Sequence, residues 1–211
     1  MILWDTVSQK FFAVLVNVSN NRIDWVVSKN DNPLSAADFC HYETDFGYGS
    51  TLPDYPKLGN TPTFMLIGTN DFAPSGFVGS SVLWISKANI GPAPITGMCP
   101  SQGIHGRIAN IKDADGTQAF TPVPGIMTDN TGFPSLQRGY VVAEPAVVGG
   151  GGSANYITLY GVNDLASGAA LTPAKNVSVA TYQFPPDAPQ CSSPEAAQHP
   201  GRQARARGLG K

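Results

Sequence analysis

Apolar and polar side chains alternate in short runs along most of this chain. Residues 22–27 read Arg-Ile-Asp-Trp-Val-Val, so Ile23, Trp25 and Val27 share one face. A period of two is the pattern of a β-strand that has one buried and one wetter face. No apolar run approaches the 18 residues that a membrane-spanning helix requires. The pattern predicts a β-rich protein made of short strands.

Three hairpins with a similar layout recur along the sequence. In each, an apolar strand leads through a turn rich in Gly, Asn or Ser into a second, returning strand. The strand pairs are 11–16 with 22–29, 63–67 with 81–87, and 138–142 with 155–160. Further strand-like segments precede the hairpins at 2–4, 55–59 and 133–136, and follow them at 41–44, 107–111 and 176–182. Each unit therefore has four predicted antiparallel strands.

Four-stranded units that repeat every 50 to 75 residues are typical of β-propeller blades. We therefore predict an all-β fold, a partial β-propeller of about three four-stranded antiparallel blades within residues 1–190. The predicted blades are 1–48, 49–128 and 129–186. A β-sandwich with similar hairpins is the alternative fold. Closed propellers have about 4 to 8 blades, so we expect this chain to be a fragment of a larger ring.

The last segment, 191–211, differs from the rest of the chain. It is rich in Arg and Gly and has no strand periodicity. We expect it to be either a disordered terminus or a frameshifted tail.

Composition narrows the classes of protein that fit. The chain has 13 Lys+Arg against 15 Asp+Glu, and 13% of its residues are charged. So few charged residues disfavour a helical bundle, whose polar faces need them. The basic residues before the tail are scattered, whereas nucleic-acid binding needs clustered cations that neutralise phosphates. We expect no nucleic-acid partner and no membrane span.

The three cysteines, Cys40, Cys99 and Cys191, are widely spaced. No CxxC pair is present, and neither His41 nor His105 has the spacing of a zinc ligand set. We expect no metal and no other cofactor. A Cys40–Cys99 disulfide and free thiols both fit the sequence. The N-terminus lacks the basic and apolar regions of a signal peptide.

Several motifs resemble a known family. They are residues 52–59 (Leu-Pro-Asp-Tyr-Pro-Lys-Leu-Gly), 69–72 (Thr-Asn-Asp-Phe) and 184–190 (Phe-Pro-Pro-Asp-Ala-Pro-Gln). They are similar to the C-terminal part of large bacterial secreted or cell-surface β-propeller proteins, of the sialidase-like superfamily. The resemblance implies a propeller fold and a secreted or cell-surface location.

The first candidate site lies at the start of a predicted inner strand, where propeller blades present side chains toward the central channel. There, Asp54, Tyr55 and Lys57 are candidate ligand-binding residues in a pocket at one face of the ring. In the alternative interpretation, Asp54 holds the entry loop by accepting hydrogen bonds from backbone N–H groups.

Catalytic candidates are few. A sialidase needs a cluster of arginines for the substrate carboxylate, and we do not expect Arg22, Arg107 and Arg138 to converge. A glycosidase needs two facing carboxyl groups, for which Asp54 and Glu144 are the candidates. The segment 113–117 (Asp-Ala-Asp-Gly-Thr) begins like a calcium loop, but it lacks the later ligands and predicts a hairpin turn.

Together these features predict a recognition or structural module of an exported bacterial β-propeller protein, with a glycan or a cell-surface protein as partner. The alternative is a sialidase-like glycoside hydrolase whose active site is incomplete in this chain. A third class is a cofactor-free propeller hydrolase that further blades would complete. Fold does not decide among these functions.

Overall fold

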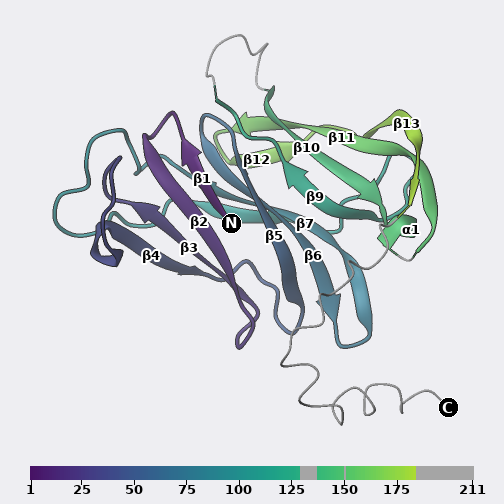
Figure 1. The fold of residues 1–211 in the computed structure, drawn as a ribbon, viewed down its shortest axis with the longest axis horizontal. Helices are drawn as coiled ribbons and strands as arrows, with labels where there is room; N and C mark the ends of the chain where they lie inside the picture. Colours follow the sequence, from purple (N-terminus) through teal and green to yellow (C-terminus); the bar gives the residue numbers. More distant parts are fainter. Residues whose placement is uncertain (129–136, 150, 184–211) are drawn as a thin grey trace, which may run out of the picture.

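The computed structural model describes residues 1–128, 137–149 and 151–183, which form three antiparallel β-sheets (Figure 1). The first sheet contains β1 (Ile2–Asp5), β2 (Lys10–Asn17), β3 (Arg22–Ser28) and β4 (Phe39–Thr44), with a 3-10 turn at Ala36–Asp38. The second contains β5 (Leu52–Asn60), β6 (Phe64–Ala73), β7 (Gly76–Ser86) and β8 (His105–Ile108). In both, the spatial order follows the order in the chain.

The third sheet contains β9 (Ala119–Pro124), β10 (Gln137–Pro145), β11 (Ser153–Leu165), β12 (Gly168–Leu171) and β13 (Lys175–Gln183). Its order is β9-β10-β11, after which β12 and β13 both pair with β11. The short helix α1 (Ala146–Gly149) connects β10 to β11. The predicted all-β class with antiparallel four-stranded sheets is confirmed.

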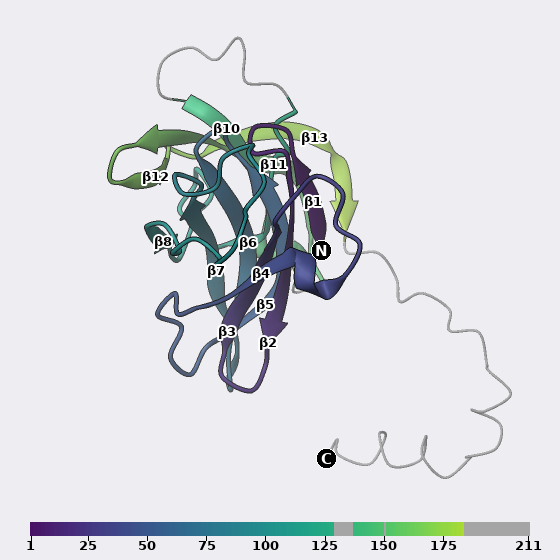
Figure 2. The same cartoon turned by 90° about the vertical axis from the view of Figure 1, so that its left-hand side faces the viewer.

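The second sheet packs between the first and the third, and the side view shows the first sheet in front of it (Figure 2). On β6, Met65 and Ile67 join the core shared with the first sheet. Phe64 and Leu66 point the other way and join the core shared with the third sheet. Because both faces of this strand are buried, its sequence is a continuous apolar run and does not alternate.

The third sheet begins within the range predicted for the second blade, 49–128. Strand β9 pairs with β10, with Val141 opposite Pro124 and Glu144 opposite Phe120. The leading strand predicted at 133–136 lies outside the described residues, as does the segment 191–211. Strand β9 contains Pro122 and Pro124. Because proline lacks the N–H that pairs strands in a sheet, the sequence does not predict a strand here.

Glycines let β9 approach the second sheet closely. A Cβ atom at Gly59 would lie 2.6 Å from the Pro124 Cβ atom, and one at Gly68 would overlap the backbone oxygen of Pro122. Side chains at these two positions would therefore push the third sheet away.

A buried polar cluster connects the end of β1 to the end of β5 and to the residue after β7. The Lys87 Nζ atom lies 2.8 Å from Asp5 Oδ1, with both side chains almost fully buried. Asn60 Nδ2 donates to the same oxygen at 2.6 Å, and Asn60 Oδ1 accepts from the Met127 backbone N–H at 2.6 Å. Burial alone would raise the pKa of Asp5, but the Lys87 charge and the hydrogen bonds outweigh it and lower that pKa.

A disulfide joins Cys40 on β4 to Cys99 in the long connection between β7 and β8. Cys40 is fully buried. The sequence is compatible with a disulfide or with free thiols at these cysteines, and the structure contains the disulfide. None of the described helices has the length and apolar character needed to cross a bilayer.

Candidate functional site

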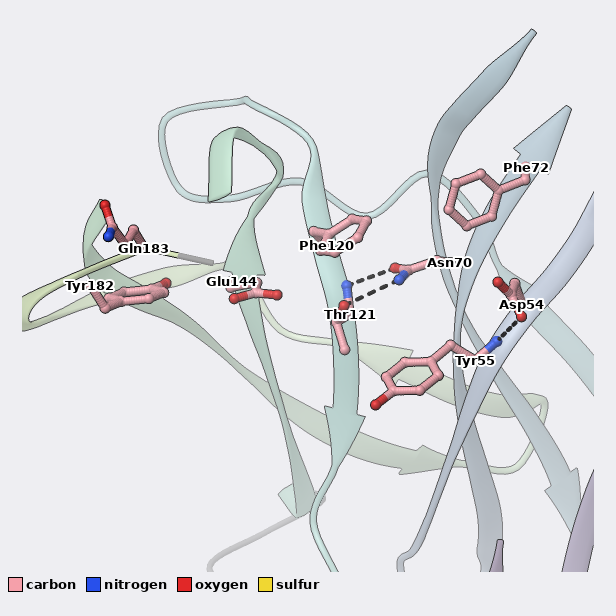
Figure 3. A pocket seen from close by; sticks show the side chains of 9 residues that line it. All are labelled: Asp54, Tyr55, Asn70, Phe72, Phe120, Thr121, Glu144, Tyr182 and Gln183. Carbon is pink, nitrogen blue, oxygen red and sulfur yellow. Dashed lines mark hydrogen bonds between the residues drawn. The ribbon is translucent and has the colours of Figure 1, made fainter. Parts of the chain in front are cut away.

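A cavity of about 500 Å³ opens between the second and third sheets. Its volume lies within the range of small-molecule sites. Figure 3 shows its walls, with β5 and β6 on one side, β9 in the middle, and β10 and β13 on the other side. The lining residues are Asp54, Tyr55, Asn70, Phe72, Phe120, Thr121, Glu144, Tyr182 and Gln183.

A β-bulge in β5 forms one wall. Asp54 pairs with Asn70 and Lys57 with Gly68, so two residues of β5 oppose one of β6. Within the bulge, Tyr55 has a φ of 55°, and 58% of its surface is exposed. Its backbone N–H donates to Asp54 Oδ1 at 2.7 Å. Bulges redirect side chains, often beside functional sites, and this one turns Tyr55 into the cavity.

A second bulge lies in β9. Val142 pairs with Val123 and Glu144 with Phe120, which leaves two residues of β9 opposite one of β10. Thr121, in this bulge, has a φ of 49°. A positive φ is rare for a β-branched residue and costs about 1–3 kcal/mol. The backbone at the cavity is therefore strained.

The side chain of Asn70 holds the second bulge in place. Its Oδ1 accepts from the Thr121 N–H at 2.7 Å and from Ser80 Oγ at 3.0 Å. Its Nδ2 donates to Thr121 Oγ1 at 3.1 Å. Since its oxygen and its nitrogen both already have protein partners, Asn70 positions the wall of the cavity and has little capacity left for a ligand.

Aromatic rings supply the apolar walls. The rings of Phe72 and Phe77 lie edge to face with centroids 5.8 Å apart, and those of Phe77 and Phe120 lie 5.1 Å apart in the same way. The Tyr182 hydroxyl donates to the Tyr156 carbonyl at 2.9 Å, which fixes the Tyr182 ring beside Glu144 (Figure 3). These walls can hold an apolar ligand surface without rearrangement.

The ionisable side chains that line the cavity are carboxylic acids and tyrosines. Burial raises the pKa of Glu144, an effect that the Thr121 hydroxyl partly offsets. Burial also raises the pKa of Tyr182, with smaller contributions from the charges of Glu144 and Asp113. Among the described residues, those that line the cavity include two carboxylic acids and no Lys, Arg or His.

The structure brings three sequence candidates, Asp54, Tyr55 and Glu144, to this one cavity. Lys57 lies just outside the lining, with its Nζ atom 3.2 Å from the centroid of the Tyr55 ring. Asp54 also accepts the backbone N–H of Tyr55, as the alternative interpretation of this residue anticipated. Figure 3 shows Asp54 and Glu144 on opposite sides of Thr121, with Tyr182 and Gln183 beyond Glu144.

Sequence reasoning missed the remaining lining residues. Thr121, Phe120 and Tyr182 lie on strands far from β5 in the chain, and only the packing of the third sheet brings them close. A repeated signal was nevertheless present. Tyr55-Pro56 and Thr121-Pro122 are each followed by a glycine, Gly59 and Gly125, at the same spacing. In each copy the residue before the proline lies in a bulge with positive φ.

The three arginines of the described residues lie outside the cavity. Arg22 Nη2 is 3.6 Å from Asp45 Oδ2, and Arg107 Nη2 is 2.8 Å from Asp71 Oδ2. Arg138 lies on β10, and, like the other two, it does not line the cavity. The described part of the chain therefore offers no arginine cluster in the cavity for a ligand carboxylate.

The segment 113–117 forms the predicted turn. The Gly116 N–H donates to the Asp113 carbonyl at 3.0 Å, and Gly116 has a φ of 87°. Hydroxyl groups of Thr117 and Thr158 donate to the Asp113 carboxylate at 3.1 and 2.9 Å. Across residues 1–128, 137–149 and 151–183, no group of three His, Cys, Asp or Glu side chains is placed to hold a metal ion.

The resemblance to sialidase-like propellers stays a prediction. Comparisons of the chain with protein-family models, with curated proteins and with solved structures found no match.

Proposed function

We propose that this chain forms three blades of a β-propeller and acts as a non-catalytic recognition module, which binds a small glycan in the cavity between the second and third sheets. The observation that carries the proposal is the cavity itself. Two bulged inner strands, aromatic walls and two carboxyl groups meet there.

The arrangement of the sheets supports the propeller. Strands β1, β5 and β9, the first of each sheet, lie next to one another, and each sheet extends outward from that strand. The bulge, proline and glycine recur at equivalent positions of β5 and β9. Such a recurrence is expected when two sheets are copies of one repeated unit.

The disulfide supports export. Disulfides persist in oxidising compartments such as the periplasm and the cell exterior. The bond between Cys40 and Cys99 therefore favours a secreted or cell-surface protein, in keeping with the bacterial exported proteins that the sequence resembles.

Recognition is favoured over catalysis by the placement of the acids. A glycosidase sets two carboxyl groups on either side of one scissile bond. Here Asp54 and Glu144 lie on opposite sides of Thr121 (Figure 3), and Asp54 already accepts a backbone N–H. A sialidase would also need arginines that face its substrate, and Arg22 and Arg107 are paired with Asp45 and Asp71.

A glycan array followed by titration calorimetry tests the proposal. The Tyr55→Ala variant removes an exposed cavity wall, so we expect at least a tenfold loss of affinity. Tyr140→Ala is the matched control, because Tyr140 is an exposed aromatic residue outside the cavity, and it should bind like the wild type.

Fluorogenic glycosides, including a sialoside, test for catalysis in the same preparations. We expect no turnover. Turnover that disappears in Glu144→Gln or Asp54→Asn would contradict the proposal of a recognition module and would show that the protein is an enzyme.

A further inference from the structure

The polar groups that face the cavity are mostly hydrogen-bond acceptors. Neither Asp54 nor Glu144 is in a salt bridge with a described residue. Two of the donors nearby are occupied, because Asn70 Nδ2 bonds to Thr121 Oγ1 and the Tyr182 hydroxyl bonds to a backbone carbonyl. The Tyr55 hydroxyl and the Gln183 amide add neutral donors, but the only charged groups of the described lining are acids. A ligand that complements these carboxyl groups supplies hydrogen-bond donors, and a positively charged donor makes the strongest hydrogen bond to a carboxylate.

The aromatic walls favour the same kind of ligand. The face of an aromatic ring attracts an ammonium group that lies within about 6 Å of its centroid. Lys57 makes this interaction at the rim, with its Nζ atom 3.2 Å from the centroid of Tyr55, so it occupies one face of that ring and leaves the other for a ligand. Tyr182 presents a second ring beside Glu144 (Figure 3).

An anionic ligand meets the opposite conditions. Its carboxylate would be enclosed with the acids at positions 54 and 144, and no basic residue among the described lining would pair with it. Like charges in a partly desolvated site repel each other, and an unpaired buried charge is costly. The lining therefore discriminates against acidic sugars such as sialic acid.

We propose that the ligand of this cavity is an amino sugar that carries a free ammonium group, which pairs with one of the two carboxylates while the sugar ring lies against the aromatic walls. This inference rests on the proposed function, because it names the class of glycan that the module recognises. The ammonium group binds a carboxylate, and the apolar faces of the sugar ring pack on the rings of Tyr55 and Phe120.

Calorimetry with three matched sugars tests the inference. The probes are a β-1,4-linked glucosamine disaccharide, the same disaccharide with both amines acetylated, and N-acetylneuraminic acid. A hydrogen bond to a charged group contributes enough free energy to change an affinity about tenfold or more. We expect the free amine to bind at least about tenfold more tightly than the acetylated form, and the acidic sugar to bind most weakly.

Variants connect this preference to the cavity. Glu144→Gln and Asp54→Asn keep the shape of the side chain and remove its charge, so each should reduce the preference for the amine severalfold. Glu43→Gln changes an exposed acid on β4 outside the cavity and should leave the preference for the amine unchanged.

A fourth probe, choline, carries an ammonium group without a sugar ring and should bind at least tenfold more weakly than the amino sugar.

The outcomes separate the two proposals. Equal binding of the free and acetylated disaccharides, or tighter binding of N-acetylneuraminic acid, with loss of binding in Tyr55→Ala, would overturn the amino-sugar inference and leave the recognition site standing. Choline that binds as tightly as the amino sugar would overturn the sugar part of the inference. Binding that Tyr55→Ala, Glu144→Gln and Asp54→Asn all leave unchanged would overturn both proposals.

Discussion

Asn70 on β6 and Thr121 on β9 are joined by two hydrogen bonds between the second and third sheets. The Thr121 N–H donates to Asn70 Oδ1 at 2.7 Å, and Asn70 Nδ2 donates back to Thr121 Oγ1 at 3.1 Å. This pair of hydrogen bonds keeps Thr121 at a φ of 49°. It thereby fixes the bulge that forms the middle wall of the cavity.

Asn70→Ala should therefore destabilise the protein. The substitution leaves the partly buried Thr121 N–H and the buried Ser80 hydroxyl without the oxygen that accepts from both. An unsatisfied buried polar group costs about 1–3 kcal/mol. We expect a loss of about 2 kcal/mol in the free energy of unfolding, measured by urea denaturation. Asn89→Ala, which changes an exposed asparagine, should stay within about 0.5 kcal/mol of the wild type. Equal effects of the two substitutions would contradict the role given to Asn70.

Gly68→Ala tests the close approach of the third sheet. The added Cβ atom would meet the backbone oxygen of Pro122, so β6 and β9 would have to separate. Overpacking of this kind costs about 1–3 kcal/mol, and we expect weaker glycan binding as well. Gly91→Ala is the control, because a Cβ atom at Gly91 meets nothing within 4 Å. An unchanged melting temperature and affinity for Gly68→Ala would show that the sheets do not meet at this point.

The buried pair of Asp5 and Lys87 makes stability depend on pH. The pKa of Asp5 is lower in the folded chain than its ordinary value of 3.8. Its stabilising contribution is present above pH 3.8 and is lost as the pH falls through the lower, folded value. Removing one partner of a buried pair costs about 3–5 kcal/mol. We expect Lys87→Met to lose that much at neutral pH, and to lose less on further acidification than the wild type does.

Denaturation curves between pH 2 and pH 7 measure this dependence. Glu43→Gln serves as the control for removal of an exposed acid, and should follow the wild-type profile. A profile of Lys87→Met that parallels the wild type would show that the pair contributes nothing to acid stability.

Ionisation of Glu144 should have the opposite effect on stability to ionisation of Asp5. Burial raises its pKa above the ordinary value of 4.5, so the folded state favours the protonated acid. Its contribution to stability is present below pH 4.5 and is lost as the pH rises through the folded value. We expect Glu144→Gln to be slightly more stable than the wild type at neutral pH and to bind the amino sugar more weakly. A binding residue that costs stability is a common feature of functional sites. A less stable Glu144→Gln would mean that the hydrogen bond with Thr121 stabilises the fold by more than burial of the carboxylate costs.

The sequence predicted the elements that pack in a regular way and missed those that depend on distant contacts. The hairpin of β2 and β3 followed from alternation. The central run at Phe64–Ile67 was recognised as a strand, although burial on both faces hides its period. Strand β9 was missed because Pro122 and Pro124 argue against a strand.

The same distinction applies to the site. Asp54, Tyr55 and Glu144 could be selected from residue chemistry, and the structure places them together. The role of Thr121 could not be predicted, because its positive φ results from a bulge that Asn70 stabilises from another sheet. Local propensity carries no information about such a contact.

The disulfide gives a further prediction about stability. It closes a loop whose ends are 59 residues apart, and constraint of the unfolded chain by a loop of that size corresponds to about 4 kcal/mol. We expect a Cys40→Ser/Cys99→Ser double variant to lose about 2–4 kcal/mol in urea denaturation. Dithiothreitol should destabilise the wild type to the same extent and leave the double variant unaffected. A wild-type protein that is insensitive to the reductant would contradict the structural role of this bond.

A crystal structure of the chain with the glucosamine disaccharide tests the central claim most directly. The account predicts a sugar ring against Tyr55 and Phe120, with its ammonium group within hydrogen-bond distance of the Asp54 or Glu144 carboxylate. A saturated complex in which the disaccharide lies at another surface, with the cavity between the second and third sheets empty, would contradict it.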